Sequence, residues 1–338
     1  MALVHDVIPP FQLFQPSSLT EALDLLAARG AGAWVMAGGM DSFDWLKDRT
    51  KRTSAVVDLS QVDELRGIRE SAGGLEIGAM TSLTELAEHA VVRDRFAVLA
   101  TAAGLVASPQ IRNQGTLGGN VSQDARCWYY RRGWSCYRAG GSTCYADTPT
   151  AVNREHAILH ADRCVAVSPS DTAPALIALD AQMVISRRGG ERVVDAADYF
   201  LGPDVDITRL TVLQPGELLT AIRIPATWAG ARFYFEKVRD RQVWDFALVN
   251  IAAAFKEQGG TIAEARVVVG AVAARPLRLS AVETLLAGQA VNEATATRAG
   301  ELAIAGATAL RYNGYKIPLM RNLVRRAVRG GPLTASTT

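Results

Sequence analysis

The four cysteines of this 338-residue chain lie close together in the sequence. Cys127, Cys136, Cys144 and Cys164 are separated by 8, 7 and 19 residues. Zinc sites usually contain two cysteines separated by about two to four residues, and no such pair occurs here. Four thiolates from irregular loops can instead bind a 4Fe–4S cluster. On these residues alone, free buried thiols and a zinc-binding loop are the alternatives.

The residues around the cysteines suit a cluster that carries negative charge, because nearby arginines can offset that charge. The arginines are Arg126, Arg131, Arg132, Arg138, Arg154 and Arg163. Four aromatic residues are expected to pack over the site and exclude water: Trp128, Tyr129, Tyr130 and Trp134. His156 and His160 have the spacing of neighbours on one helix face. A mixed set of histidine and cysteine ligands is therefore a further alternative.

Two glycine-rich loops, at 37–41 and 115–120, stand where strands are expected to lead into helices. A Gly-Gly pair at such a junction lets backbone N–H groups approach a phosphate closely, although each loop alone could be a tight turn. Neither loop has the pattern of a Rossmann or P-loop site. The second loop ends seven residues before Cys127. This proximity indicates redox chemistry in which electrons pass between an organic cofactor and a metal centre.

The composition is that of a globular protein, with 49% apolar and 21% charged residues and a net charge of +2. We therefore predict no nucleic-acid partner and no membrane insertion, and no run of apolar residues is long enough to span a bilayer. The first ten residues lack the pattern of a secretory signal. The four histidines form no triad or His-Glu-x-x-His motif, so we predict no catalytic residue in this chain.

Helices and strands are expected to mix without strict βαβ alternation, which indicates an α+β fold. A helix is predicted over 93–106, and antiparallel strands over 233–237, 247–256 and 262–272 with a hairpin turn at Gly259–Gly260. We predict subdomains at 1–60 and 61–228, an insertion at about 124–165 and a C-terminal domain at 229–330. The remaining residues, 331–338, are expected to form a disordered tail.

Five segments resemble, in order and spacing, the FAD-binding subunits of the xanthine dehydrogenase and carbon monoxide dehydrogenase family of molybdenum hydroxylases. They are Val35–Asp41, Gln110–Asn120, Ser168–Leu176, Pro215–Pro225 and Tyr234–Arg241. The resemblance runs from about Phe11 to Val328. It is strongest to the FAD subunit of periplasmic-type aldehyde oxidoreductases, which carry the same cysteine-rich insertion. It implies a two-part FAD-binding domain of the vanillyl-alcohol-oxidase/CO-dehydrogenase flavoprotein type and a C-terminal α+β domain.

The resemblance also implies which residues bind FAD. The pyrophosphate would be wrapped by Val35, Met36, Ala37, Gly38, Gly39, Met40 and Asp41. The second loop would contact FAD from the other side through Ile111, Thr116, Gly118, Gly119, Asn120 and Gln123. Asp171 would bind FAD hydroxyls, Leu219 would pack on the isoalloxazine, and Lys237 would lie near its polar edge. Without the resemblance, Asp171 would be read as a helix N-cap, Leu219 as a core residue and Lys237 as a surface lysine.

Two residues depart from the family pattern. Met40 stands where the family usually has threonine, which removes a hydroxyl donor from the pyrophosphate loop. Gln123 stands where some members have a threonine that contacts the flavin. Most contacts of such loops come from the backbone, so these changes affect individual contacts only.

The resemblance implies an electron-transfer subunit that carries FAD and a 4Fe–4S cluster. A large subunit with a molybdenum cofactor would oxidise the substrate, and a small subunit with 2Fe–2S clusters would pass electrons to this chain and then to an external acceptor. A subunit of the 4-hydroxybenzoyl-CoA reductase type, a stand-alone FAD oxidase and a zinc-stabilised scaffold are the alternatives. We expect a cytoplasmic protein, or a periplasmic one that is exported with a signal-bearing partner.

Overall fold

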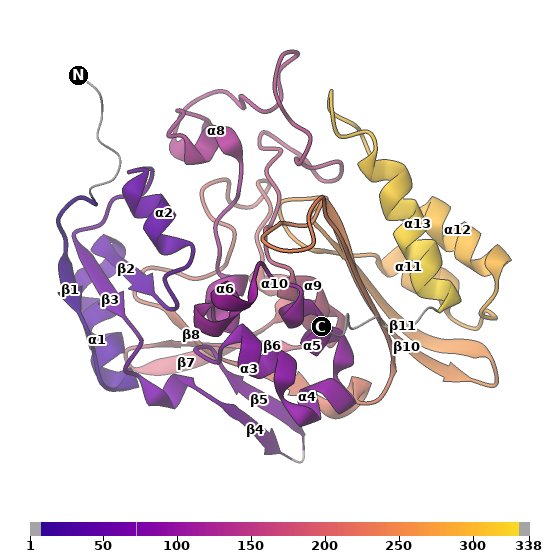
Figure 1. The fold of residues 1–338 in the computed structure, drawn as a ribbon, viewed down its shortest axis with the longest axis horizontal. Coiled ribbons are helices and arrows are strands. Elements are labelled where there is room, and N and C mark those ends of the chain that lie inside the picture. Colours follow the sequence, from indigo (N-terminus) through magenta and orange to yellow (C-terminus); the bar gives the residue numbers. More distant parts are fainter. Residues whose placement is uncertain (1–7, 72, 331–338) are drawn as a thin grey trace.

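The computed structural model describes residues 8–71 and 73–330, and the predicted tail at 331–338 lies outside them. Three separate sheets, with helices packed against them, follow one another along the chain (Figure 1). Only the small first sheet is parallel, and the two larger sheets are antiparallel. This mixture confirms the predicted α+β class.

The first sheet has the strand order β1-β3-β2 and consists of β1 (Gln12–Phe14), β3 (Ala55–Asp58) and β2 (Ala33–Met36). Helix α1 (Leu19–Arg29) begins where the Ser18 side chain accepts a hydrogen bond from the backbone N–H of Glu21, and ends at Gly30, which has a φ of 51°. After β2 the chain passes through the first glycine-rich loop into α2 (Ser42–Lys47). The loop therefore lies at the carboxyl end of a strand, as the sequence predicts.

The second sheet has the order β4-β5-β8-β6-β7. Its strands are β4 (Ile68–Ser71), β5 (Gly74–Gly78), β8 (Leu218–Pro225), β6 (Gln182–Arg187) and β7 (Gly190–Asp195). Its helices are α3 (Leu83–Glu88), α4 (Ala90–Arg95), α5 (Ala97–Gly104), α6 (Pro109–Gln114), α7 (Leu117–Val121), α9 (Thr172–Ala178) and α10 (Ala196–Tyr199). All of these helices except α6 share one apolar core with the sheet.

The single helix predicted over 93–106 is wrong, because the chain breaks there into α4 and α5. The break is at Phe96, whose backbone leaves the helical region with φ −137° and ψ 46°. Its ring is completely buried in the core. The pattern of apolar residues continues across the break, so periodicity alone does not reveal it.

The third sheet has the order β12-β11-β10-β9 and packs against three helices. The strands are β9 (Arg232–Val238), β10 (Val249–Gln258), β11 (Thr261–Gly270) and β12 (Leu277–Arg278), and the helices are α11 (Ser280–Leu286), α12 (Glu293–Ala303) and α13 (Lys316–Arg329). Gly259 and Gly260 form the predicted turn between β10 and β11, with φ values of 59° and 77° that favour glycine.

The cysteine-rich insertion is mostly irregular and contains the short helix α8 (Trp128–Arg131) and a 3-10 turn at Tyr137–Ala139. Figure 1 shows it at one end of the molecule, between α2 and α13. Side chains from both neighbours hold it: Thr50 donates to the carbonyl of Arg131 (2.8 Å), and Asn313 donates to that of His156 (3.0 Å). Side chains from outside the insertion therefore add to its backbone hydrogen bonds, such as the one from the N–H of Ala157 to the carbonyl of Val165 (2.9 Å).

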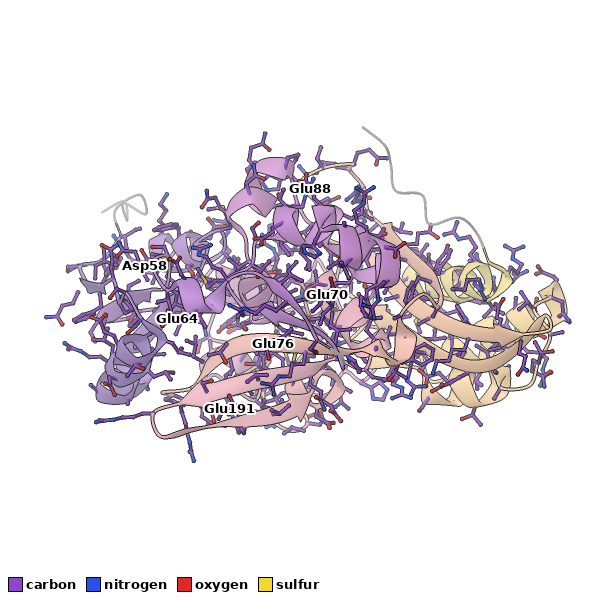
Figure 2. The ribbon with its side chains drawn as sticks, turned by 90° about the horizontal axis from the view of Figure 1, so that it is seen from below. Asp58, Glu64, Glu70, Glu76, Glu88 and Glu191 are labelled. Atoms are coloured by element: carbon purple, nitrogen blue, oxygen red, sulfur yellow. The ribbon has the colours of Figure 1, made fainter. Side chains whose placement is uncertain are left out.

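Figure 2 labels the acidic residues Asp58, Glu64, Glu70, Glu76, Glu88 and Glu191, of which Asp58 is buried. Some of them form ion pairs, such as Glu76 with Arg223 (2.8 Å) and Glu70 with Arg95 (3.3 Å). Both signs of charge are thus interspersed at these positions. Among the residues that the structure describes, no helix combines the length and apolar character needed to cross a membrane.

Candidate functional site

A cavity of about 500 Å³ lies where the two glycine-rich loops meet. All of the predicted FAD-contacting residues line it except Met36 and Lys237. Ligand sites of proteins typically have volumes of about 300–1,000 Å³. The fold therefore brings together predicted residues from four distant parts of the chain: the two loops, the segment with Asp171 and the strand that carries Leu219.

The first glycine-rich loop packs directly on the second. A Cβ atom on Gly38 would overlap the backbone carbonyl of Gln114, and one on Gly39, whose φ is 75°, would lie 2.9 Å from the Phe43 ring. Within residues 8–71 and 73–330, no protein acceptor receives a hydrogen bond from the backbone N–H groups of Gly38, Gly39 and Met40. The loop therefore offers a row of free donors beside the cavity.

The backbone N–H groups of the second loop donate hydrogen bonds to acceptors within the protein. The backbone N–H groups of Leu117 and Gly118 donate to the carbonyls of Thr81 (3.0 Å) and Ala79 (2.8 Å). The N–H of Gly119 donates to the Thr116 hydroxyl (3.0 Å), and that of Asn120 to the Thr116 carbonyl (2.9 Å). Because these donors are already paired, the second loop shapes the wall of the cavity. The first loop instead contributes N–H groups that have no protein acceptor among the described residues.

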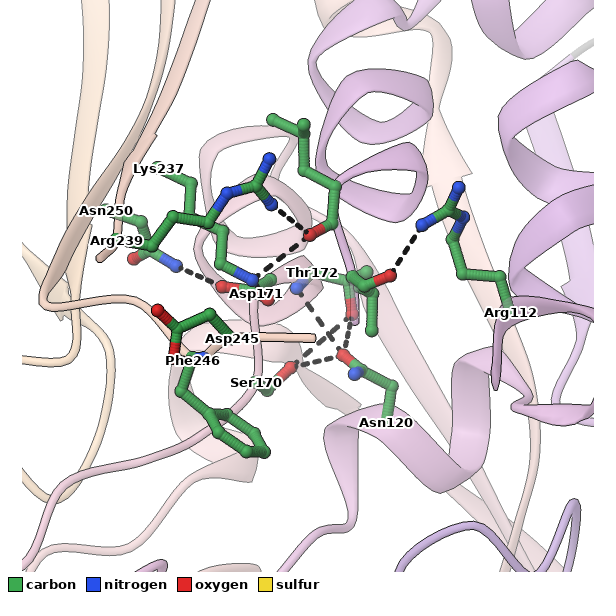
Figure 3. A network of polar contacts seen from close by, with 12 residues as sticks. Arg112, Asn120, Ser170, Asp171, Thr172, Lys237, Arg239, Asp245, Phe246 and Asn250 are labelled. Atoms are coloured by element: carbon green, nitrogen blue, oxygen red, sulfur yellow. Dashed lines mark hydrogen bonds and ion pairs between the residues drawn. The ribbon is translucent and has the colours of Figure 1, made fainter. Parts of the chain in front are cut away.

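Asn120 joins the second loop to the segment before α9 (Figure 3). Its Oδ1 accepts hydrogen bonds from the hydroxyls of Ser170 (2.7 Å) and Thr172 (2.6 Å). Its Nδ2 donates to the Oε1 of Gln123 (3.3 Å). Both Asn120 and Gln123 line the cavity with side chains that the protein itself holds in place.

Asp171 and Lys237 form a buried ion pair, with 2.5 Å between Oδ2 and Nζ (Figure 3). Asn250 donates to the other oxygen of Asp171 (3.0 Å), and Lys237 also donates to the carbonyl of Leu105 (3.1 Å). The surface-lysine alternative is wrong, because the Lys237 side chain is 0% exposed. Asp171 does occupy the N-cap position of α9, as the alternative predicts, but its carboxylate makes no capping bond, and the Ser170 hydroxyl accepts from the N–H of Ala173 instead.

A loop of the C-terminal part adds cavity residues that the sequence analysis missed, Trp244, Asp245 and Phe246. Trp244 has a φ of 53°, and its N–H donates to the carbonyl of Ala107 (2.7 Å), which itself has a φ of 42°. Aromatic residues in a loop between two strands carry no periodic signal, so only the fold reveals their position.

Asp41 connects the first loop to the cysteine-rich insertion. Its Oδ1 accepts from Arg126 (3.3 Å) and Arg131 (2.5 Å), and its Oδ2 accepts from the Trp45 indole (3.0 Å). Burial, together with the charge of Arg131, lowers the pKa of Arg126 to about 10, while Asp41 opposes this shift. The guanidinium also lies 4.0 Å from the centre of the Phe246 ring. The two predicted sites are thus in direct contact.

The four cysteines line one small cavity together with Arg138 and Arg163. Cys127, Cys136 and Cys164 are buried, Cys144 is half-buried, and all four are free thiols. The described part of the chain contains no compact group of three or more His, Cys, Asp or Glu side chains that could hold a single metal ion. The four thiols line the cavity without forming such a group.

Electrostatics around this cavity are dominated by burial. Burial raises the pKa of the Cys127 thiol to about 12 and also raises that of Cys164, so binding of a metal at either thiol would release a proton. Arg138 is buried and forms an ion pair with Asp124, which also pairs with Lys51 at 3.0 Å. Buried positive charge thus lies beside the thiols, as the sequence predicts.

The aromatic residues of the insertion behave differently from one another. Tyr129 and Tyr130 line the cysteine cavity, and the ring of Trp134 contacts that of Tyr129 with 5.3 Å between centroids. Trp128 does not line this cavity, and its side chain is 55% exposed. The expectation that all four cover the site is therefore wrong for Trp128.

The two histidines near Cys164 do not lie on one helix face. Residues 153–160 are irregular, and His160 is exposed. His156 is buried, and its Nε2 lies 3.3 Å from the sulfur of Cys127. Burial, with a smaller effect of Lys316, lowers the pKa of His156 to about 4. A paired set of ligands from both histidines is therefore absent, and the contact with Cys127 was not predicted.

Comparison with known families assigns nearly the whole chain. Residues 9–227 match the FAD-binding domain in molybdopterin dehydrogenase, and residues 233–330 match the C-terminal domain of the CO dehydrogenase flavoprotein. The chain belongs to the FAD-binding medium subunits of the molybdenum hydroxylase family. This assignment confirms the family suggested by the five motifs, the predicted combination of an FAD-binding domain with a C-terminal flavoprotein domain, and FAD as a cofactor.

Individual relatives support the assignment along the full length. The carbon monoxide dehydrogenase medium chain of Hydrogenophaga pseudoflava is 30% identical over 328 residues, which are 95% of this chain and 97% of the relative. The aldehyde oxidoreductase FAD-binding subunit PaoB of Escherichia coli K12 is 36% identical over 266 residues, which are 78% of this chain and 81% of the relative.

Solved structures agree. A structure of the Hydrogenophaga pseudoflava carbon monoxide dehydrogenase aligns with a TM-score of 0.75 and 29% identity, covering 95% of this chain and 97% of that chain. Quinoline 2-oxidoreductase from Pseudomonas putida 86 aligns with a TM-score of 0.74 and 27% identity, covering 95% and 96%. Both solved chains therefore share the fold of this chain over nearly its whole length.

Proposed function

We propose that this chain is the electron-transfer subunit of a molybdenum hydroxylase of the aldehyde oxidoreductase or xanthine dehydrogenase type, and that it carries FAD and a 4Fe–4S cluster. The observation that carries the proposal is the direct contact of the first glycine-rich loop with the cysteine-rich insertion, through Asp41, Arg126 and Arg131. When bound, FAD and the 4Fe–4S cluster would supply the redox chemistry. They would carry electrons from the 2Fe–2S clusters of a partner to an external acceptor. The protein's part is to bind, orient and shield them.

In this proposal the first glycine-rich loop holds the FAD pyrophosphate, because its N–H groups are free and face the cavity. Val35 to Asp41 would wrap the pyrophosphate, and the second loop would shape the opposite wall. Leu219 would pack against the isoalloxazine. Asp171 would accept hydrogen bonds from FAD hydroxyls, and Lys237 would act through Asp171, since it is buried behind that carboxylate.

The cluster would be bound by Cys127, Cys136, Cys144 and Cys164. Two observations support this part of the proposal: all four thiols line one cavity, and no compact three-ligand group for a single ion is found among the described residues. Zinc prefers four ligands around one point, whereas a 4Fe–4S cluster takes thiolates that surround a larger body. Arg138 and Arg163 would offset its charge.

The proposal also assigns partners and a domain division. The names of the relatives, medium chain and FAD-binding subunit, support a complex with a large molybdenum subunit and a small 2Fe–2S subunit. The three sheets fall one to each of the proposed units 1–60, 61–228 and 229–330, which supports these boundaries.

The test is expression of this chain alone and together with partner subunits encoded beside it. The chain should bind FAD and iron in both cases, but should oxidise aromatic aldehydes with a dye acceptor only in the complex. Cys136→Ser should remove the broad visible absorption of the cluster and spare the flavin bands. Zinc in place of iron would refute the cluster, and full turnover by the isolated chain would favour a stand-alone oxidase.

A further inference from the structure

Cys127 differs from the other three cysteines in its position. It lines the cysteine cavity and also a second cavity of about 210 Å³. That second cavity shares Arg126, Asp171 and Phe246 with the large cavity between the glycine-rich loops. Cys127 is therefore the thiol that faces the proposed flavin site.

The sulfur of Cys127 also lies within hydrogen-bond distance of a buried side chain. The imidazole Nε2 of His156 lies 3.3 Å from the sulfur, and His156 is only 3% exposed. In the described residues no other side-chain hydrogen bond to a cysteine sulfur is found. A buried imidazole is thus directed at one particular thiol.

The C-terminal domain fixes the backbone of His156. Asn313 donates from Nδ2 to the carbonyls of His156 and Ala157, each at 3.0 Å. Lys316 donates from Nζ to the carbonyls of Glu155 and Ala271, each at 2.8 Å. Asn313 and Lys316 are completely buried. The position of the imidazole is therefore set by α13 and the turn before it, independently of Cys127.

The direction of the hydrogen bond follows from the chemistry of the thiol. A cysteine that binds iron is a thiolate, which can accept a hydrogen bond but cannot donate one. The ring must then carry its proton on Nε2. Its Nδ1 has no partner among residues 8–71 and 73–330, so no competing contact turns the ring away from the sulfur.

We propose that His156 is a positioning residue for the cluster: it donates an Nε2–H hydrogen bond to the Cys127 thiolate and raises the reduction potential of the cluster. Hydrogen bonds to ligating sulfurs stabilise the additional negative charge of the reduced state. This inference rests on the proposed 4Fe–4S cluster. It assigns the shift in reduction potential to the cysteine that faces the proposed flavin site. A change in the cluster potential alters the driving force for electron transfer between the two cofactors.

The test compares variants of the complex purified without oxygen. His156→Leu removes the donor at similar size, and His156→Gln keeps an N–H group at a similar distance. His160→Asn is the matched control, because His160 is an exposed histidine with a φ of 47°, which asparagine tolerates. Iron and FAD per chain are measured first, and the cluster potential is then obtained from a redox titration followed by EPR.

His156→Leu should keep its iron and FAD and shift the cluster potential to a more negative value. His156→Gln should recover part of that shift, and His160→Asn should match the wild type. An unchanged potential in His156→Leu with full iron content would overturn the inference. Loss of iron from both His156 variants would also overturn it, because His156 would then be needed to retain the cluster. Wild-type complex without iron would instead refute the proposed cluster itself.

Discussion

The flavin cavity and the cysteine cavity both adjoin the cavity of about 210 Å³ but are constructed in different ways. The flavin cavity lies at the ends of regular elements: β2 leads into the first loop, β8 carries Leu219, and the second loop is bound to the backbone at Ala79 and Thr81. The cysteine cavity lies in irregular chain, which is held by side chains such as Lys51, Asn313 and Lys316. One site is therefore part of the core fold, and the other depends on a few distant clamps.

This difference predicts unequal responses to mutation. Changes in the glycine-rich loops should abolish FAD binding while the insertion keeps its contacts. Changes in the clamps should loosen the cysteines while the flavin cavity survives. The variants below test that separation, beginning with the largest expected effect.

Gly38→Val should abolish FAD binding. The branched side chain would overlap the Gln114 carbonyl and force the two loops apart. Overpacking of this kind typically costs about 1–3 kcal/mol, and a backbone neighbour cannot move aside as a flexible side chain can. Flavin per chain after gel filtration measures the effect, and iron content should stay near the wild-type value.

Gly119→Ala is the matched control for Gly38→Val. A Cβ there would lie 3.0 Å from the Thr116 hydroxyl and 3.6 Å from the Ala37 side chain, so it meets side chains only. We expect weaker FAD binding but not its loss. Full flavin occupancy in Gly38→Val would show that contact between the loops is not required for the cavity.

Asn313→Ala should reduce iron retention while FAD stays bound. The substitution leaves the buried carbonyls of His156 and Ala157 without their donor. Each unpaired buried group costs about 1–3 kcal/mol, so the segment that carries His156 should loosen. Iron and flavin are measured on the same sample, before and after incubation with a chelator.

Asn322→Ala provides the control, because Asn322 is an exposed asparagine on α13. It should behave as the wild type. If Asn313→Ala lost flavin and iron together, the two cavities would not be independent, and the comparison above would fail.

Lys316 should make the stability of the protein rise with pH. Burial lowers the pKa of Lys316 to about 7 from its ordinary value of 10.5. Between these two values the unfolded chain binds more protons than the folded one, so the free energy of unfolding increases with pH, by up to ~1.4 kcal/mol per pH unit. Thermal unfolding across this window should show the rise.

Lys316→Met should remove this dependence on pH, although it should also lower stability throughout because two carbonyls lose their donor. An unchanged slope in Lys316→Met would assign the pH dependence to another group. The flavin cavity contains no part of this clamp, so FAD affinity should not follow the same profile.

The sequence was most informative where function requires unusual local residues. Gly38, Gly39 and the four cysteines stood out because few other residues can provide free backbone N–H groups or thiolate ligands. These residues do lie around two cavities. The family motifs added Asp171 and Leu219, which have no distinctive local pattern.

The contacts that complete the sites could not be read from the sequence. His156 and Cys127 are 29 residues apart, and Asn313 is 157 residues from His156. No periodicity relates such residues. The irregular path of the insertion brings His156 to Cys127, and packing of the segment before α13 against the insertion brings Asn313 to His156. The burial of Lys237 could not be read from the sequence for the same reason. Its ion-pair partner Asp171 lies 66 residues away along the chain.

Met40 offers the smallest and most specific test of the first loop. Its side chain is 44% exposed at the cavity, where the family pattern has threonine. Met40→Thr would add a hydroxyl donor beside the free N–H groups of Gly38 and Gly39, and one hydrogen bond to a charged phosphate contributes about 1.5–3 kcal/mol at most. Partial exposure to water should reduce this gain to about tenfold in FAD affinity, or ~1.4 kcal/mol. Met40→Val has the shape of threonine without the hydroxyl, so titration of FAD into both variants isolates the hydrogen bond. Equal affinities would mean that the pyrophosphate does not lie at this loop, whereas tighter binding by Met40→Thr alone would place it there.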